Sequence, residues 1–159
     1  MSAQHRHRRI GNLLVGAQFT LIGLCVLPVG PTLGSGQLRP LGLASLLLAG
    51  LVGGLALLAM GRDLRVHPVP DHTSPLHRNG IYAVMRHPMY AAVLLACLGV
   101  ALASGRVLAI LALAVLAGVL HVKARFEDRL LTAKFGGEFA EYARRVPAIV
   151  PQPWRARRR

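Results

Sequence analysis

Two long stretches without a charged side chain constrain this chain more than any other feature. They run from Ile10 to Val29 and from Leu41 to Met60, 20 residues each. An apolar helix of about 20 residues crosses the ~30 Å hydrocarbon layer of a bilayer. The first stretch is long for the core of a secretory signal peptide, and no small-residue cleavage pattern follows it. We therefore expect two retained membrane helices.

Two shorter apolar stretches follow, Tyr90–Ala103 and Val107–Val122. If the first of them begins at Pro88, it forms about 25 Å of helix at 1.5 Å per residue. We expect the two to form a helical hairpin that turns at residues 104–106 and crosses the membrane. A shallow re-entrant hairpin is the alternative. The predicted fold class is an all-α, polytopic membrane protein with about four transmembrane helices.

The distribution of charge predicts the orientation of these helices. The chain combines 53% hydrophobic residues with a formal net charge of +13. Of its 19 lysines and arginines, all but Arg39 and Arg106 lie before the first stretch, between the second and third, or after the fourth. Such basic segments stay on the cytoplasmic side. We predict a cell-membrane protein with both termini in the cytoplasm. We expect no nucleic-acid partner, because topology accounts for the charge and no nucleic-acid-binding motif accompanies it.

The chain becomes amphipathic after the fourth apolar stretch. Apolar residues recur at helical spacing from Phe126 to Phe135, which predicts a cytoplasmic C-terminal helix. Gly136-Gly137 should end it, since a glycine commonly follows a helix end. A short helix from Glu138 to Arg145 is expected next, with Glu141 and Arg145 spaced four residues apart as an ion pair.

The stretch RNGIYAVMRHPMY places polar and aromatic groups where the third helix should begin. Pro88 suits the first turn of a helix, because its missing N–H would have no partner there. Arg86 and His87 then lie at a helix N-terminus, which favours anionic groups. The faces of Tyr82 and Tyr90 attract cations, including a sulfonium. The alternative is that these residues are ordinary interfacial side chains at a helix end.

A second polar group, Glu127-Asp128, lies just beyond the fourth apolar stretch. These acids could merely form ion pairs with Arg125 and Arg129. A carboxylate at this boundary is equally suited to a ligand's ammonium group, because hydrogen bonds between charged partners are strong.

Four motifs follow one another in a fixed order: NGIYAVMRHPMY, FEDRLL, KFGGEFAEY and VPAIVP, with an apolar hairpin between the first two. The ordered set resembles the isoprenylcysteine carboxyl methyltransferase and phospholipid methyltransferase family, integral membrane enzymes that use S-adenosylmethionine. The likeness runs from about Asn79 to Pro151. It implies S-adenosylmethionine as cofactor, and the lipid bilayer and a hydrophobic or prenylated methyl acceptor as partners.

The resemblance also implies roles for individual residues. Arg86-His87-Pro88-x-Tyr90 matches the family's RHPxY, and Glu127-Asp128 matches its acidic pair. Glu127 would hold the cofactor's α-ammonium, and Arg86 would orient an anionic group of acceptor or cofactor. His87, or an acidic residue, would help to remove a proton if the acceptor is an amine. In full, we predict cofactor binding at Tyr82, His87, Pro88, Tyr90, Gly99, Glu127 and Asp128, and catalytic roles for Arg86 and His87.

The chain departs from the family pattern at three places. Ala92 stands where a glycine is frequent, and Phe139 replaces a usual tyrosine. The segment Val146–Pro151 lacks the arginine often found before the last proline in prenylcysteine enzymes, which weakens the case for a prenylcysteine carboxylate as substrate.

We expect residues 1–159 to form one membrane domain: two spans in 1–62, a methyltransferase-like catalytic region in 63–151 and a basic tail in 152–159. Cys25 and Cys97 lie in apolar stretches and are interpreted as small hydrophobic residues, so no metal site is predicted. Two other functions stay open. One is a membrane reductase of related hairpin architecture. The other is a non-catalytic helical assembly protein, for which the G-x-x-x-G motif at Gly50 and Gly54 permits close helix contact, although packing within the bundle is the favoured use of that motif.

Overall fold

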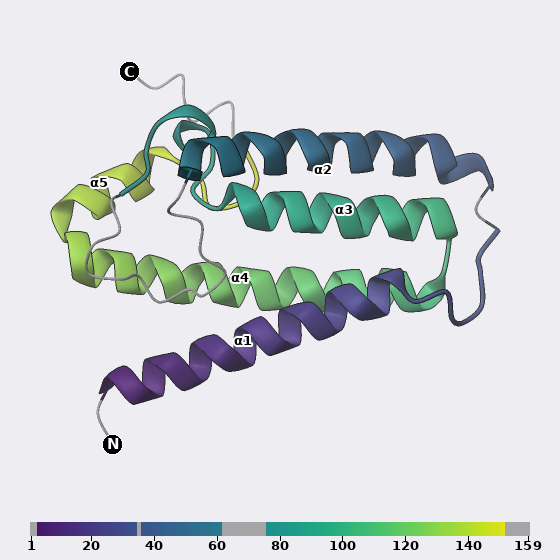
Figure 1. The fold of residues 1–159 in the computed structure, drawn as a ribbon, viewed down its shortest axis with the longest axis horizontal. Helices are drawn as coiled ribbons and strands as arrows, with labels where there is room; N and C mark the ends of the chain where they lie inside the picture. The colour runs from purple at the N-terminus through teal and green to yellow at the C-terminus, as the bar shows by residue number, and fades with distance from the viewer. Residues whose placement is uncertain (1–2, 35, 62–75, 152–159) are drawn as a thin grey trace.

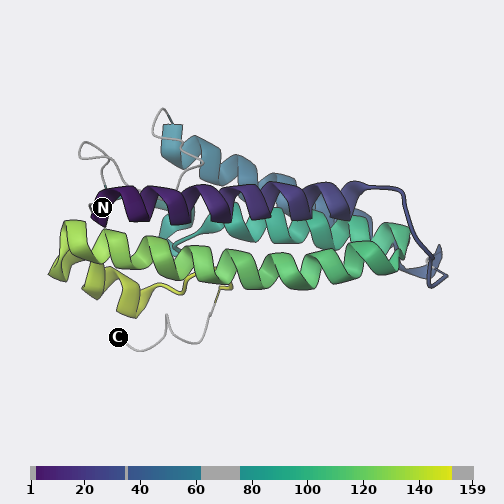
Figure 2. The ribbon, with the colours of Figure 1, turned by 90° about the horizontal axis from the view of Figure 1, so that it is seen from below.

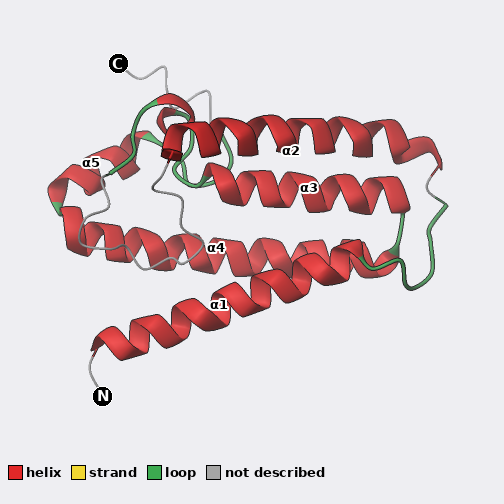
Figure 3. Cartoon of the chain, in the orientation of Figure 1, coloured by secondary structure: helices red, strands yellow, loops and turns green. Residues whose placement is uncertain are grey.

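The computed structural model describes residues 3–34, 36–61 and 76–151. Within these ranges the chain is helical and contains no strand, apart from an isolated bridge between Thr32 and Arg106 (Figure 3). The predicted all-α class is confirmed. The predictions that concern Arg62, Arg65 and the basic tail at 152–159 lie outside the described residues.

In the described part of the chain, four long helices run alternately up and down, and a short helix folds back at one end (Figure 1). α2 packs along α3, and α1 packs along α4 (Figure 2). The start of α1, the start of α3 and all of α5 lie at the same end of the bundle (Figure 1). The elements are α1 (Ala3–Val26), η1 (Gly36–Leu38), α2 (Arg39–Met60), η3 (Gly80–Ala83), α3 (Pro88–Ser104), α4 (Val107–Phe135) and α5 (Gly137–Arg145).

The helices have the length and the outer surface of membrane helices. α1 from His5, α2 and α4 are each long and apolar enough to cross a bilayer, and α3 is an apolar helix of 17 residues. Large apolar side chains face outward: Leu13 is 73% exposed, Leu47 69% and Leu58 81%. A soluble bundle would bury such residues, whereas lipid covers them at no cost. These observations support a polytopic membrane protein.

Several helix ends differ from the predicted stretches; α1, for example, begins at Ala3 rather than Ile10. α1 ends at Val26 rather than Val29, because Leu27 precedes Pro28 and a residue before proline disfavours the helical region. The fourth span and the amphipathic segment form one continuous helix of 29 residues, α4. As predicted, Gly136 ends it, with a positive φ of 58°.

The hairpin between α3 and α4 turns at residues 104–106, as predicted. Gly105 has a φ of 60°, and its N–H donates to the carbonyl of Ala101. The connection between α1 and α2 pairs with this turn. The N–H of Leu33 donates to Gly105 O at 2.9 Å, and the N–H of Val107 donates to Pro31 O at 3.1 Å. Backbone hydrogen bonds therefore join the two connections at this end of the bundle.

α2 and α3 approach most closely at two glycines. A Cβ on Gly42 would lie 2.7 Å from the carbonyl oxygen of Gly99 and 2.8 Å from the backbone nitrogen of Ala103. A Cβ on Gly99 would lie 2.6 Å from Leu46 Cγ. The Ser45 hydroxyl adds a hydrogen bond of 2.7 Å across this contact, to the carbonyl of Leu95. Small residues therefore permit the α2–α3 contact.

The G-x-x-x-G motif does not take part in that contact. A Cβ on Gly50 or on Gly54 would meet no atom within 4 Å. The prediction that the motif packs the bundle is therefore wrong. The spacing was right for a close contact, but the helix turns a different face, marked by Gly42, toward α3.

Candidate active site

The residues Arg86 and His87 are held in place before α3 begins. Pro88 occupies the first position of α3, as predicted, and is fully buried. The backbone N–H of Arg86 donates to Pro147 O at 2.9 Å, and that of His87 donates to Ala148 O at 2.8 Å. The segment after α5 thus lies alongside the start of α3 and fixes the backbone from which both side chains project.

The Arg86 guanidinium joins three elements. Its Nη1 donates to the carbonyl oxygens of Ala143 and Val146, each at 2.7 Å, and its Nη2 donates to Asp128 Oδ2 at 2.7 Å. The guanidinium also lies 6.0 Å from the centre of the Phe139 ring. Among the described residues, no hydrogen-bond partner is found for its buried Nε. Arg86 thus donates hydrogen bonds to two backbone carbonyl groups at the end of α5 and binds an acid of α4.

The His87 imidazole lies between two carboxylates and is 6% exposed. Its Nε2 is 2.9 Å from Asp128 Oδ1, and its Nδ1 is 3.5 Å from Glu127 Oε2. Both predicted acids therefore face the predicted histidine, although Glu127 lies 40 positions after His87 in the chain.

Tyr90 completes the contact between α3 and α4. Its hydroxyl donates to Glu127 Oε2 at 2.7 Å. Its ring stacks on the His87 ring, with centroids 5.2 Å apart and an interplanar angle of 7°. Residues 87 and 90 lie three apart around the first turn of α3, so both side chains face the same side of the helix.

The two acids differ in how fully their oxygens are engaged. Both oxygens of Asp128 have strong partners, Arg86 at 2.7 Å and His87 at 2.9 Å. In Glu127 one oxygen, Oε2, accepts from Tyr90 and lies near His87, and its side chain is 26% exposed against 19% for Asp128. A carboxylate can accept about four hydrogen bonds. Glu127 is therefore the acid with more capacity left for a cationic ligand.

Tyr82 lies in η3, close to this cluster. Its carbonyl accepts a hydrogen bond of 2.6 Å from the Tyr142 hydroxyl, and both tyrosines are buried. Burial, and then the negative charge of Glu127, raise the pKa of Tyr82 to about 12. Burial likewise raises the pKa of Tyr142 to about 12, and the nearby Arg86 charge partly opposes the shift. Both phenols are therefore neutral near pH 7.

Gly99 is the predicted site residue that the fold places apart from the others. It lies eleven residues into α3 from Pro88, roughly 16 Å along the axis at 1.5 Å per residue. There it faces Gly42 and Leu46 of α2. Close packing between helices accounts for a glycine at this position.

Two of the three departures from the family pattern, at residues 92 and 139, are packed in apolar clusters. Ala92 is buried in an apolar cluster with Val52 and Met85. Phe139 is 2% exposed and packs with Tyr142 and the other residues of the cluster under α5. In this chain the missing tyrosine hydroxyl at 139 is replaced by apolar contact.

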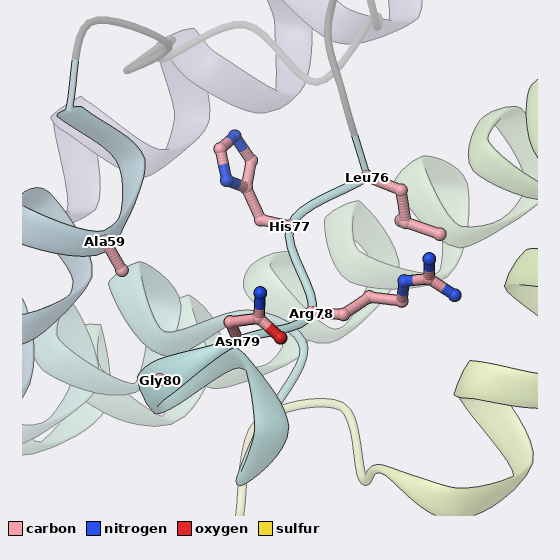
Figure 4. Close-up of a pocket in the computed structure, with 6 residues that line it drawn as sticks. All are labelled: Ala59, Leu76, His77, Arg78, Asn79 and Gly80. Carbon is pink, nitrogen blue, oxygen red and sulfur yellow. The ribbon is translucent and has the colours of Figure 1, made fainter.

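A pocket of about 330 Å³ lies beside the cluster, where α2 ends and η3 begins (Figure 4). Residues Ala59, Leu76, His77, Arg78, Asn79 and Gly80 line it. The His77 ring lies 5.8 Å from the Tyr82 ring, so Tyr82 connects this pocket to the cluster. Arg78 pairs with Glu138 of α5 at 2.7 Å. In the described part of the chain, no three His, Cys, Asp or Glu side chains gather in a way that could hold a metal ion.

Two polar residues at the cluster were not predicted. Lys123 of α4 is buried, and its ammonium lies 5.1 Å from the centre of the Tyr90 ring. Gln18 of α1 accepts a hydrogen bond from it. The available signals were a polar residue inside the first apolar stretch and a lysine one helical turn before Glu127.

Comparison with known proteins identifies a matching protein family. A family model for phospholipid methyltransferases matches residues 39–138, which include α2, α3, α4 and the start of α5. The matched region contains the RHPxY segment and both acids. It leaves out α1.

Three curated relatives share parts of this chain. Cobalt-zinc-cadmium resistance protein CzcN of Cupriavidus metallidurans is 46% identical over 46% of the chain and 34% of its own length. Protein-S-isoprenylcysteine O-methyltransferase B of Arabidopsis thaliana is 28% identical over 69% and 57%, respectively. Methanethiol S-methyltransferase 2 of Bradyrhizobium diazoefficiens is 40% identical over 49% and 29%.

The matches therefore span between about a third and somewhat over half of these relatives. No solved structure gives a significant match. The family match covers well over half of the chain and contains the residues that meet at the start of α3. This chain belongs to the phospholipid methyltransferase family.

Proposed function

We infer that this protein is an integral membrane methyltransferase that uses S-adenosylmethionine and acts on a lipid-like or isoprenoid acceptor. The proposal places the protein in the cell membrane with both termini in the cytoplasm. Residues 1–159 form one membrane domain in this proposal, with the catalytic groups within 63–151.

The observation that carries the proposal is the meeting of Tyr90 and Glu127. Two motifs 37 residues apart in the chain come together through a hydrogen bond of 2.7 Å at the end where the basic residues gather. A hydrogen bond that only joined the helices could lie anywhere along α3 and α4. Here it holds a carboxylate with spare acceptor capacity beside an aromatic face.

The side chains of this cluster suit the proposed cofactor. S-adenosylmethionine carries a sulfonium and an α-ammonium, and it supplies a methyl group whose transfer leaves the bonding electron pair on sulfur. A carboxylate is the natural partner for the ammonium. Aromatic faces attract sulfonium cations, and we assign this role to Tyr82, because His87 and Lys123 already contact the Tyr90 ring. Glu127 and Tyr82 therefore fit the group chemically: the charge of Glu127 reaches Tyr82 and raises its pKa, and the Tyr90 hydroxyl orients Glu127.

The other cluster residues hold this arrangement. Arg86 and His87 together engage both oxygens of Asp128, which fixes the end of α4 against the start of α3. We therefore propose a positioning role for Arg86 in place of acceptor binding, because four of its contacts are already within the chain. His87 keeps Glu127 and Tyr90 together.

The acceptor enters from the bilayer in this proposal. Methyl transfer needs alignment of donor and acceptor and exclusion of water more than it needs a strong base. A carboxylate acceptor requires no proton removal, whereas an amine or thiol must lose one proton. The relatives' names include an isoprenylcysteine O-methyltransferase and a methanethiol S-methyltransferase, so the test below distinguishes an ester product from an amine or thioether product.

Titration of purified protein in detergent with S-adenosylmethionine tests the proposal. We expect saturable binding by the wild type and about tenfold weaker binding by Glu127→Gln, because the charge-assisted hydrogen bond to the ammonium is lost. Glu141→Gln is the matched control, since Glu141 is exposed and, within the described residues, pairs with Arg145 of its own helix. The control should bind as the wild type does.

Transfer of labelled methyl groups to a membrane extract then identifies the chemistry. Label released by mild base indicates a methyl ester, and label that resists base indicates an amine or thioether product. Absence of binding by the wild type would refute the proposal. Equal binding by wild type and Glu127→Gln would refute the role of Glu127.

A further inference from the structure

Lys123 is a buried lysine near the end of a membrane helix. It is 1% exposed and is among the largest fully buried side chains in the described part of the chain. A lysine near a helix end ordinarily extends its ammonium to the headgroups and water. This one turns into the bundle instead, where a charge is costly unless it is paired.

The ammonium of Lys123 has two partners from other helices. It donates a hydrogen bond of 2.6 Å to Oε1 of Gln18 in α1, which is 6% exposed. It also lies 5.1 Å from the centre of the Tyr90 ring in α3. Tyr90 in turn donates to Glu127, one helical turn after Lys123 on α4. Gln18, Lys123, Tyr90 and Glu127 therefore form a connected set across three helices.

This set restricts Tyr90 more than Glu127 alone would. A cation within about 6 Å of an aromatic face is attracted to it, and the attraction grows when both groups are desolvated. Gln18 restricts the lysine, because a buried amide oxygen that accepts from an ammonium keeps the flexible stem in one conformation. The ring of Tyr90 is thus held by His87, Lys123 and Glu127 together.

α1 lies outside the region that the family model matches, residues 39–138. Its contact with the cluster through Gln18 therefore lies outside the matched core. We propose that Gln18 and Lys123 are positioning residues, through which α1 orients Tyr90 and Glu127 for the cofactor. This inference rests on the proposed function.

The first test needs no cofactor. The chain has three tyrosines, Tyr82, Tyr90 and Tyr142, so ring-labelled tyrosine gives few signals and Tyr90→Phe assigns one of them. We expect Lys123→Met and Gln18→Leu each to shift or broaden the Tyr90 ring signals and to leave the Tyr142 signals in place.

Lys134→Met is the matched control for Lys123→Met. Lys134 is the other lysine, also lies on α4 and also approaches an aromatic ring, at 4.8 Å from the centre of Phe135. Its replacement should leave the Tyr90 signals unchanged. If Tyr90 is equally unmoved in Lys123→Met and Gln18→Leu, the proposed connection does not exist.

The second test measures the affinity for S-adenosylmethionine. We expect about tenfold weaker binding in Lys123→Met and about threefold weaker binding in Gln18→Leu. Gln18→Glu keeps an oxygen acceptor for the ammonium and should bind within about twofold of the wild type. If Lys123 acted only as a repelling charge near a cationic ligand, its removal would tighten binding. The sign of the change therefore decides between positioning and simple electrostatics.

The outcomes separate this inference from the proposed function. A wild type that does not bind S-adenosylmethionine refutes the function and, with it, the cofactor role of α1, while the ring signals still report whether Lys123 holds Tyr90. A wild type that binds, with Lys123→Met and Gln18→Leu unchanged or tighter, refutes the inference alone. Should Lys123→Met fail to fold, Gln18→Leu and its rescue by Gln18→Glu decide the question.

Discussion

Between α2 and α3 the backbones approach until a Cβ on Gly42 or Gly99 would lie 2.7 or 2.6 Å from its nearest neighbour. At the start of α3, the same helix meets α4 through charged and aromatic side chains: Arg86 and His87 contact Asp128. The first contact depends on the absence of side chains and the second on their presence. α3 therefore packs closely through small residues along its length and places charged and aromatic side chains at its start.

This difference predicts which amino-acid substitutions each of the two regions tolerates. The glycine contact should be sensitive to added volume and indifferent to charge. The cluster should be sensitive to the loss of a donor or a charge and more tolerant of small changes in volume. Three substitutions, from the largest expected effect to the smallest, test this contrast.

Replacement of Gly42 by leucine should have the largest effect. The new side chain would meet the backbone of Gly99 and Ala103, and backbone atoms cannot move aside as a flexible side chain can. We expect a loss of at least about 3 kcal/mol in the free energy of unfolding, the upper part of the usual range for overpacked cores. Unfolding in mixed micelles measures it. Gly50→Leu is the control, because nothing lies within 4 Å of its Cβ position. Equal losses in both variants would show that the bundle does not depend on the Gly42 contact.

Replacement of Arg86 by lysine separates charge from geometry in the cluster. Lysine keeps the charge but presents one ammonium, which cannot reach Asp128 and the carbonyls of Ala143 and Val146 as the forked guanidinium does. We expect about 2–3 kcal/mol of destabilisation, because partly buried acceptors lose their donors. Arg144→Lys, at an exposed position of α5, should be neutral. A stability equal to that of the wild type in Arg86→Lys would mean that charge alone matters at this position.

Replacement of Tyr142 by phenylalanine should have the smallest effect of the three. The shape is kept and one hydrogen bond, to the Tyr82 carbonyl, is lost, which costs about 1–2 kcal/mol when a buried acceptor is left unpaired. This difference should depend on pH. The pKa of Tyr142 is raised from 10.0 to about 12, so the folded state favours the neutral phenol. The contribution is intact below pH 10 and is lost as the pH rises toward 12.

Unfolding of wild type and Tyr142→Phe across this alkaline range measures the effect, and the absorbance of the phenolate reports the titration directly. A stability difference that stays constant to the upper end of the range would show that the Tyr142 hydroxyl is not buried as described.

Much of the helical framework could be predicted from the sequence because its signals are local. Apolar stretches, the proline at 88 and the glycines at 105 and 136 each act on their own neighbourhood, and the helices begin or end there. The closeness of Arg86, His87, Glu127 and Asp128 was predictable only through the order of motifs, and the structure brings these four residues together.

The remaining features depend on contacts between distant segments. Lys123 and Gln18 are 105 residues apart, and nothing in their local sequence shows that the lysine turns inward. Gly50 and Gly54 have the spacing of a contact motif, yet Gly42 makes the contact, because the rotation of a helix is decided by all of its neighbours. The surroundings of Gly99 likewise depend on its neighbours in α2, which the local sequence does not show.

The unbroken length of α4 has a consequence for the level at which chemistry takes place. The helix begins at Val107, next to the turn at the far end of the bundle, and about 20 residues of helix span the ~30 Å of hydrocarbon. Counted from Val107, that span ends at Phe126, directly before Glu127 and Asp128. The length of α4 therefore sets the depth of the acids relative to the bilayer. Under the proposed function, only acceptors whose reactive atom reaches the headgroup layer come close to these acids. Under that function, the thickness of the membrane would contribute to the choice of acceptor.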